Sequence, residues 1–236
     1  MELMKDQIQE NLKEVRRKAD EACRRAGRDP QEVTLLAVSK TKPIEDIRTA
    51  MELGQHAFGE NYVQEIRDKY EALGDQVEWH IIGHLQRNKV KYIVDKVRMI
   101  HSVDTIELAQ QIEKEAAKRN VDIDVLMEVN IAQEESKWGF TAEEAPEAAK
   151  QIGTLPHVHL HGLMTSAPIT DNAETNRVYF RGLRQLAEKI GAENYPNVVM
   201  DTLSMGMTAD YEVAIEEGAT IVRVGTAIFG ARNYSK

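Results

Sequence analysis

The sequence predicts an α/β fold, a single (β/α)8 barrel with one extra helix at its N-terminus. Short apolar runs rich in β-branched residues alternate with helical patterns along the chain, and this alternation indicates a parallel sheet with right-handed crossovers. About eight such units in roughly 200 residues fit a closed barrel. A doubly wound sheet would use fewer strands, and no G-x-G-x-x-G motif follows the first one. No Pro/Gly/Ser-rich linker interrupts the pattern, so residues 1–236 are expected to form one domain.

The first strand is expected at 33–39, an apolar run that is followed directly by Lys40. Parallel strands covered on both faces are continuously apolar, and active sites of such folds lie at the C-terminal ends of the strands. An apolar barrel mouth would desolvate the ammonium group of Lys40 and favour the free amine. The free amine is the form that attacks an aldehyde to make a Schiff base. An ordinary lysine on the rim of the barrel is the alternative interpretation.

Helices are expected wherever apolar residues recur every three or four positions. Pro43 opens one helix, Thr105 and Thr141 are typical N-caps, and Gly27 and Gly54 stand just after C-termini. The expected helices cover 2–26, 43–54, 62–70, 88–96, 104–119, 141–152, 172–190 and 211–217. The remaining strands are expected at 56–58, 77–82, 98–101, 121–129, 157–164, 198–203 and 220–224.

Composition and charge narrow the classes of function. The chain has 236 residues, of which 42% are hydrophobic and 29% charged, as is ordinary for a soluble globular protein. The formal net charge of −9 argues against a general nucleic-acid or anionic-membrane surface, and no apolar run approaches the ~20 residues that span a bilayer. Cys23 is the single cysteine, which excludes an intrachain disulfide and a cysteine-based zinc site. The N-terminus does not resemble a signal peptide, so we expect a cytoplasmic protein.

Two glycine-containing loops stand where barrels of this kind bind phosphate, after the seventh and eighth strands. They are Leu203-Ser-Met-Gly-Met-Thr208 and Gly225-Thr-Ala-Ile-Phe-Gly230. Glycine lets backbone N–H groups approach an anion closely, and hydroxyl groups add donors. Barrel-closing turns that need glycine anyway are the alternative. The predicted phosphate ligands are Ser204, Gly206, Gly225 and Thr226.

Arg223 lies within the eighth strand, on the same face as Ile221 and Gly225. A buried unpaired charge costs several kcal/mol, so this arginine needs an anion or an aromatic acceptor; a structural salt bridge is the alternative. A Schiff-base lysine, a phosphate cradle and an arginine between them suit pyridoxal 5′-phosphate (PLP), with its aldehyde on Lys40 and its ring nitrogen facing Arg223. A guanidinium there would leave the ring nitrogen unprotonated and weaken the ring as an electron sink.

Several motifs spread over nearly the whole chain also carry a family resemblance. They are Leu36–Pro43, Phe58–Tyr62, His80–Lys89, His101–Asp104, Gly162–Met164, Leu203–Met207 and Arg223–Gly230. Together they resemble the PLP homeostasis protein family of the YggS/PROSC type. The resemblance implies a barrel of the alanine racemase N-terminal-domain type, with the Schiff base on Lys40 and ring contact from Arg223. It further implies phosphate contacts from Ser204, Gly225 and Thr226, and positions near the cofactor for Asn61 and Met164. Thr208 stands where the family more often has serine.

The function that this resemblance implies is PLP binding and supply, which limits free aldehyde and keeps vitamin B6 and amino acids in balance without evident turnover. PLP-dependent enzymes would be the recipients, and we expect a monomer or weak dimer. Alanine racemases are similar only in the barrel and add a C-terminal β-domain with a catalytic tyrosine. A racemase needs two acid/base groups, and only Lys40 is evident here. Two alternatives stay open: a PLP-dependent enzyme with racemase-like or weak transaminase-like activity, and an aldolase barrel that uses Lys40 without a cofactor.

Two further patterns are interpreted as ordinary surface features. Alternate histidines on the sixth strand have the spacing of metal ligands, but no carboxylate cluster accompanies them, so no metal site is expected. These histidines are His157, His159 and His161. A basic run is more typical of a solvated helix face than of a nucleic-acid or anion patch. Its members are Arg87, Lys89, Lys91, Lys96 and Arg98.

Overall fold

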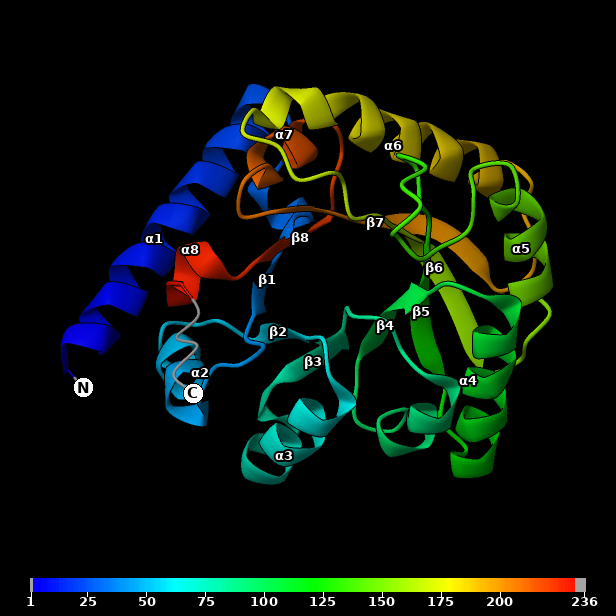
Figure 1. Cartoon of the computed structure of the whole chain (residues 1–236), viewed down its shortest axis with the longest axis horizontal. Coiled ribbons are helices and arrows are strands. Elements are labelled where there is room, and N and C mark those ends of the chain that lie inside the picture. The colour runs from blue at the N-terminus through cyan, green and yellow to red at the C-terminus, as the bar shows by residue number, and fades with distance from the viewer. Residues whose placement is uncertain (1, 232–236) are drawn as a thin grey trace.

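A closed parallel barrel forms the centre of the molecule. The structure is a computed structural model that describes residues 2–231. Its eight strands pair in sequence order, and the first strand pairs with both the second and the eighth. Figure 1 shows the strands as a ring with the helices outside it. The predicted (β/α)8 barrel is therefore confirmed.

The strands are short except for the seventh. They are β1 Thr34–Val38, β2 Ala57–Glu60, β3 Glu78–Ile81, β4 Met99–Val103, β5 Ile123–Glu128, β6 Val158–Met164, β7 Val198–Met207 and β8 Ile221–Val224. The prediction that the seventh strand ends at residue 203 was wrong, because β7 pairs with β8 as far as Met207. Most of the segment that we expected to be a loop after this strand is therefore part of the sheet.

The helices follow the predicted order with two exceptions, the helix expected at 88–96 and a short helix at 226–229 that was not predicted. The helices are α1 Glu2–Arg25, α2 Ile44–Glu52, α3 Val63–Leu73, α4 Ile106–Arg119, α5 Ala145–Ile152, α6 Arg177–Gly191, α7 Tyr211–Glu216 and α8 Thr226–Phe229. The helix expected at 88–96 was wrong, since this segment forms the 3-10 helix η3, Arg87–Tyr92. Its valine, isoleucine and tyrosine residues are weak helix formers. On α6, Val178 is exposed although it is apolar, and Phe180 is buried.

The extra N-terminal helix α1 closes one side of the barrel. It packs against α2, α7 and α8, as can be followed in Figure 1. The apolar residues that recur at three- or four-residue steps along α1 are all buried, as expected for a helix with one face on the core. They are Ile8, Leu12, Val15, Ala19 and Cys23.

The interior of the barrel has an apolar layer below a polar layer. The apolar layer is a separate cluster of buried side chains, distinct from the larger core between the sheet and the helices. Its members are Leu36, Ala57, Met99, Leu126, Met164 and Ile221. Strand residues alternate between the two faces of a sheet, so Arg223 and Glu128 lie two positions further toward the carboxyl ends on the same inner face. The polar layer is therefore at the end of the barrel where sites are built.

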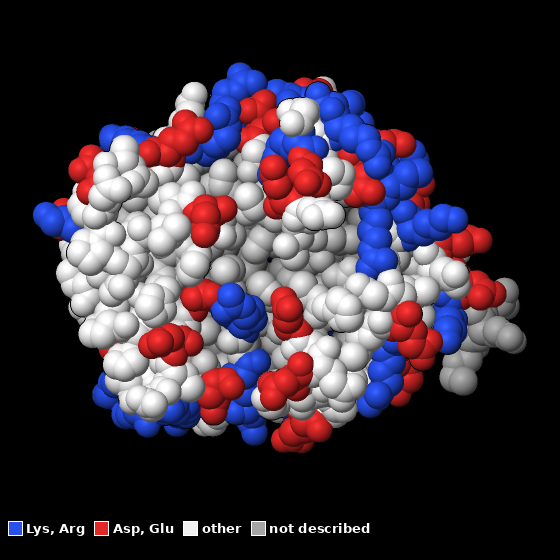
Figure 2. Space-filling view, turned by 180° about the vertical axis from the view of Figure 1, so that it is seen from behind, with Lys and Arg blue, Asp and Glu red and all other residues white. Residues whose placement is uncertain are grey.

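The outer surface carries both signs of charge. Figure 2 shows the face opposite to that of Figure 1, where acidic and basic side chains are interspersed around a largely uncharged centre. Within residues 2–231, no helix has the combined length and apolar character that crossing a bilayer requires.

Gly162 offers a test of the tight contact between β6 and β7. A Cβ atom at this position would lie 1.7 Å from the carbonyl oxygen of Thr202, its partner in the ladder. We expect Gly162→Ala to lower the free energy of unfolding by roughly 3 kcal/mol, because backbone must shift to admit the methyl group. Urea unfolding followed by circular dichroism measures this change.

The matched control is Gly182→Ala on α6. A Cβ atom there would meet Ile131 at an ordinary 3.5 Å, and alanine favours a helix interior over glycine by about 1 kcal/mol. This variant should be as stable as the parent or more so. Equal loss of stability in the two variants would contradict the proposed contact.

Candidate functional site

Lys40 lies in the turn that directly follows β1 and is half-buried. The next residue, Thr41, has a φ angle of 65°, in the left-handed region that β-branched residues rarely adopt. The backbone directly after Lys40 is therefore in an unusual conformation, which contacts with the residues around the turn must stabilise.

A buried ion pair lies directly behind this turn, between β2 and α3. Glu60 is fully buried, Lys69 is nearly so, and the Lys69 Nζ atom lies 2.7 Å from the Glu60 carboxylate. Lys69 also donates to the backbone carbonyl of Ser39 at 2.9 Å, and the Ser39 hydroxyl donates to Glu60 at 2.6 Å. Glu65 accepts from Lys69 at 2.8 Å and from the Thr41 N–H at 2.7 Å. The cluster therefore bonds to the residues on both sides of Lys40.

Arg223 is buried in the polar layer inside the barrel. Its guanidinium donates to the Ser204 hydroxyl at 2.7 Å and to the Thr165 carbonyl oxygen at 2.9 Å. The same hydroxyl lies 2.9 Å from Nδ1 of His101, whose Nε2 lies 2.9 Å from Nδ1 of His80. Since a guanidinium can only donate, these neutral groups form a chain of acceptors that starts at Arg223.

Burial sets the protonation states of these hydrogen-bonded side chains. Burial and the charge of Arg98 lower the pKa of His80 to about 4. Burial, with His80 and Arg223, holds the pKa of His101 well below its usual value. Burial also lowers the pKa of Arg223 to about 10, which still leaves it charged at neutral pH. Arg223 is thus the cation of the layer, and both histidines are neutral.

The structure places Ser204 away from the predicted phosphate loop. It is fully buried within β7, and its hydroxyl is engaged with Arg223 and His101. This geometry does not support a phosphate contact from its side chain. Gly206 has a φ angle of 92°, and a Cβ atom there would lie 2.5 Å from the side chain of Ala214. Packing against α7 therefore accounts for this glycine.

The second predicted loop keeps the features of an anion cradle. Thr226 is exposed at the start of α8, and Gly225 just before it is half-buried. A Cβ atom on Gly225 would lie 3.2 Å from Val38, so this backbone lies against the end of β1. The first N–H groups of a helix have no partner within it. Lys42 donates to the Phe229 carbonyl oxygen at 2.8 Å and so caps the other end of α8.

Asn61 and Met164 also lie at carboxyl ends of strands. Asn61 follows β2 and is half-buried, and its backbone would be 2.7 Å from a Cβ atom on Gly83. Met164 is the last residue of β6 and belongs to the interior cluster. Of the predicted cofactor residues, Lys40, Asn61, Met164, Arg223, Gly225 and Thr226 therefore lie at or near this end of the barrel.

The sequence analysis missed Glu128, the last residue of β5. Burial, together with the nearby charge of Asp104, raises the pKa of Glu128 to about 7, and Arg223 opposes this shift. Its carboxyl group therefore exists in both protonation states near neutral pH. The available signal was its place two residues beyond Leu126 on the inner face of a strongly apolar strand.

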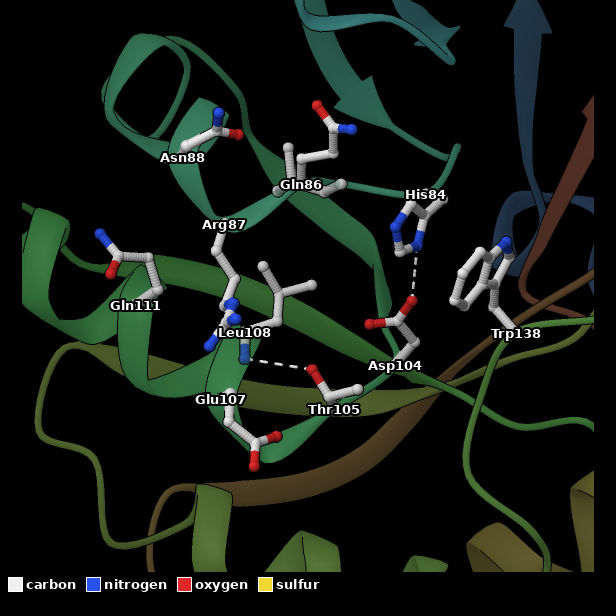
Figure 3. Close-up of a pocket in the computed structure, with 11 residues that line it drawn as sticks. His84, Gln86, Arg87, Asn88, Asp104, Thr105, Glu107, Leu108, Gln111 and Trp138 are labelled. Atoms are coloured by element: carbon white, nitrogen blue, oxygen red, sulfur yellow. Dashed lines mark hydrogen bonds and ion pairs between the residues drawn. The ribbon is translucent and has the colours of Figure 1, made fainter.

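A cleft of about 900 Å³ opens beside the mouth, in the loops after β3 and β4. Figure 3 shows His84 and Asp104 facing one another in this cleft, with 2.7 Å between Nδ1 and Oδ2. The exposed ring of Trp138 stacks on His84 at 4.1 Å between centroids. Two of the sequence motifs, 80–89 and 101–104, therefore meet in one opening whose Asp104 is close enough to influence Glu128.

The two patterns interpreted as surface features have ordinary partners. The three histidines have separate carboxylate partners: His157 meets Glu113, His159 meets Asp122, and His161 meets Asp124 and Asp201. Within the described residues, no group of three or more such side chains is placed so that it could hold a metal ion. In the basic run, Lys96 and Arg98 pair with Asp95 and Asp124, while Lys89 and Lys91 lie over the Tyr92 ring.

Comparisons with known proteins agree with the motifs. The family model for the N-terminal domain of alanine racemase matches residues 4–233. A pyridoxal phosphate homeostasis protein of Aquifex aeolicus is 50% identical over 226 residues, 95% of this chain and 98% of that protein. One from Haemophilus influenzae is 44% identical over 231 residues, 97% of each.

A solved structure of PipY from Synechococcus elongatus PCC7942, with PLP bound, superposes with a TM-score of 0.82. It is 33% identical and covers 94% of this chain and 100% of that chain. These matches confirm the resemblance that the sequence motifs indicate. The chain belongs to the alanine racemase N-terminal-domain family and, within it, to the pyridoxal phosphate homeostasis proteins.

Proposed function

We propose that this protein binds PLP at the mouth of the barrel, attached to Lys40 through a Schiff base, and serves PLP homeostasis without turnover. The observation that carries the proposal is the parallel pairing of β1 and β8, which puts Lys40 and Arg223 at the same end of the barrel and the end of β1 against the start of α8. Relatives with this family name, and PipY with bound PLP, support it. PLP-dependent enzymes as recipients, a monomer or weak dimer, and a cytoplasmic location remain predictions.

The residues present fit this cofactor. PLP, when bound, supplies an electron sink, and a cation facing its ring nitrogen weakens that property. Arg223 would be this cation, and Ser204 orients its guanidinium by accepting from it. The Thr226 hydroxyl and the first N–H groups of α8 would hold the phosphate, with Thr208 as the hydroxyl available in the turn after β7. Asn61 and Met164 would border the ring.

A second candidate function is weak PLP-dependent proton exchange on amino acids. Glu128 favours it, because a carboxyl group with a pKa of about 7 at the barrel mouth can both accept and donate a proton. It supplies the second acid/base group that the sequence analysis did not find.

The first prediction concerns the lysine. Lys40→Ala should remove the visible absorbance that PLP gives the protein while leaving the fold intact, because a lysine in a mouth turn contributes little to the core. Mass spectrometry of the borohydride-reduced parent should place the cofactor mass on Lys40. Lys42→Ala is the control and should keep the colour, since Lys42 caps α8. Normal colour in Lys40→Ala would move the attachment elsewhere.

The second prediction separates the phosphate contact from the ring contact. Thr226→Val should weaken PLP binding roughly tenfold to a hundredfold, since a hydrogen bond to a charged group is worth about 1.5–3 kcal/mol. Binding of pyridoxal, which lacks the phosphate, should hardly change. Ser204→Ala should affect both ligands equally, because it acts through Arg223. If Ser204→Ala weakens only PLP and Thr226→Val weakens both ligands, the phosphate lies at Ser204, as the family resemblance implies.

The third prediction tests the second candidate function. In D2O with PLP, any exchange of the α-hydrogen of alanine should rise as pH increases through about 7, because the Glu128 carboxylate is the base and exists above its pKa. Glu128→Gln should remove this rise. Glu113→Gln, which lies beside His157, is the control. Exchange that persists unchanged in Glu128→Gln would exclude Glu128 as the second proton-transfer group.

A further inference from the structure

Glu60, Glu65 and Lys69 form a cluster between β2 and α3 that has no part in the proposed cofactor contacts. This cluster nevertheless bonds to Ser39 and Thr41, the residues on both sides of Lys40. We propose that Glu65 and Lys69 are positioning residues, which hold the turn from Ser39 to Thr41 so that Lys40 is presented at the barrel mouth. This inference rests on the proposed function of Lys40 and adds the residues that prepare it.

Stability alone does not account for the cluster. Burying an ion pair costs several kcal/mol per ion, and well-packed apolar residues often do as well. Burial raises the pKa of Glu60 to about 7 despite the adjacent Lys69. The second carboxylate oxygen of Glu60 is buried and has no hydrogen-bond partner among the described residues. An arrangement this costly is better explained by the geometry that it imposes.

That geometry is imposed on the three residues around the lysine. Lys69 donates to the Ser39 carbonyl oxygen, the Ser39 hydroxyl donates to Glu60, and the Thr41 N–H donates to Glu65. The left-handed conformation of Thr41 is strained for a β-branched residue. Its hydrogen bond to a carboxylate offsets that strain, because bonds to charged groups are the strong ones.

A single helix face supplies the two residues that reach the turn. Glu65 and Lys69 are four positions apart on α3, so they are neighbours on one face and bond to each other at 2.8 Å. Regular β1 ends at Val38, before the lysine. The Ser39 N–H still donates to the Gly59 carbonyl oxygen of β2 at 3.1 Å, whereas the Thr41 N–H donates to Glu65. The cluster therefore holds the chain where it leaves the sheet.

Glu65 allows a matched pair of variants, because its side chain is a quarter exposed and both changes should fold. In Glu65→Gln the amide oxygen can still accept from the Thr41 N–H, whereas Glu65→Leu has no acceptor. We expect Glu65→Leu to speed amide hydrogen exchange at Thr41 by tenfold or more in cofactor-free protein, and to slow PLP capture at Lys40 by about tenfold. Glu65→Gln should stay close to the parent in both measurements.

Tyr70→Phe is the control on the same helix, since it removes only the bond from Tyr70 to Asp75. It should leave exchange at Thr41 and PLP capture unchanged. The inference is overturned if Glu65→Leu has the same exchange rate at Thr41 as the parent. It is also overturned if both Glu65 variants lose protection at Thr41 by the amount that their loss in free energy of unfolding accounts for. Hydrogen exchange needs no cofactor, so a failure of Lys40 to capture PLP in the parent would refute the proposed function without deciding the positioning role.

A second variant tests Lys69 without leaving an unpaired buried charge. Glu60→Gln with Lys69→Met removes both charges together, which avoids the penalty of an orphaned ion. The double variant should fold and should also lose exchange protection at Thr41, because the bond to the Ser39 carbonyl is gone. Unchanged protection in a folded double variant would show that Lys69 does not position the turn.

Discussion

The buried guanidinium of Arg223 constrains the whole upper interior of the barrel. It receives no hydrogen bond, so every group around it must accept, and its partners are a hydroxyl and a carbonyl oxygen. Burial lowers the pKa values of both His80 and His101, and the charge of Arg223 lowers that of His101 further. The apolar layer therefore ends at Arg223 and does not continue toward the carboxyl ends of the strands. The end of the barrel where the strands stop is therefore polar by necessity, and it is suited to hold a ligand.

Two electrostatic clusters lie on opposite sides of the sheet at the Lys40 turn. Inside, the hydrogen-bonding partners of Arg223 among the described residues are all neutral, which leaves its charge available to a ligand. Outside, Lys69 is bonded to two carboxylates and a carbonyl oxygen, which uses all three of its donors. The inner cluster therefore has the character of a binding site and the outer one that of a support.

Apolar periodicity predicted the barrel well because it reports which face of an element is buried. It could not report how far a strand pairs. The tail of β7 is rich in glycine and methionine and resembles a loop, yet closure of the barrel pairs it with β8 through a shifted register. That extension is what moved Ser204 from the predicted phosphate loop into the interior. The clusters around Glu60 and Glu128 join residues distant in sequence, so only the fold brings them together.

Within the proposed function, the residues of the site suit holding a reactive aldehyde better than transforming substrates. In the proposed function, Arg223 faces the ring nitrogen, and with a pKa of about 10 it keeps its charge throughout the neutral range. A permanently charged donor cannot hand its proton to the ring, so the ring stays a weak electron sink. Glu128, with a pKa of about 7, is suited to proton exchange near neutral pH, but a weak electron sink gives it little acidity to act on. Covalent attachment to a well-positioned lysine needs neither an electron sink nor a second base, and the residues around Lys40 meet that simpler requirement.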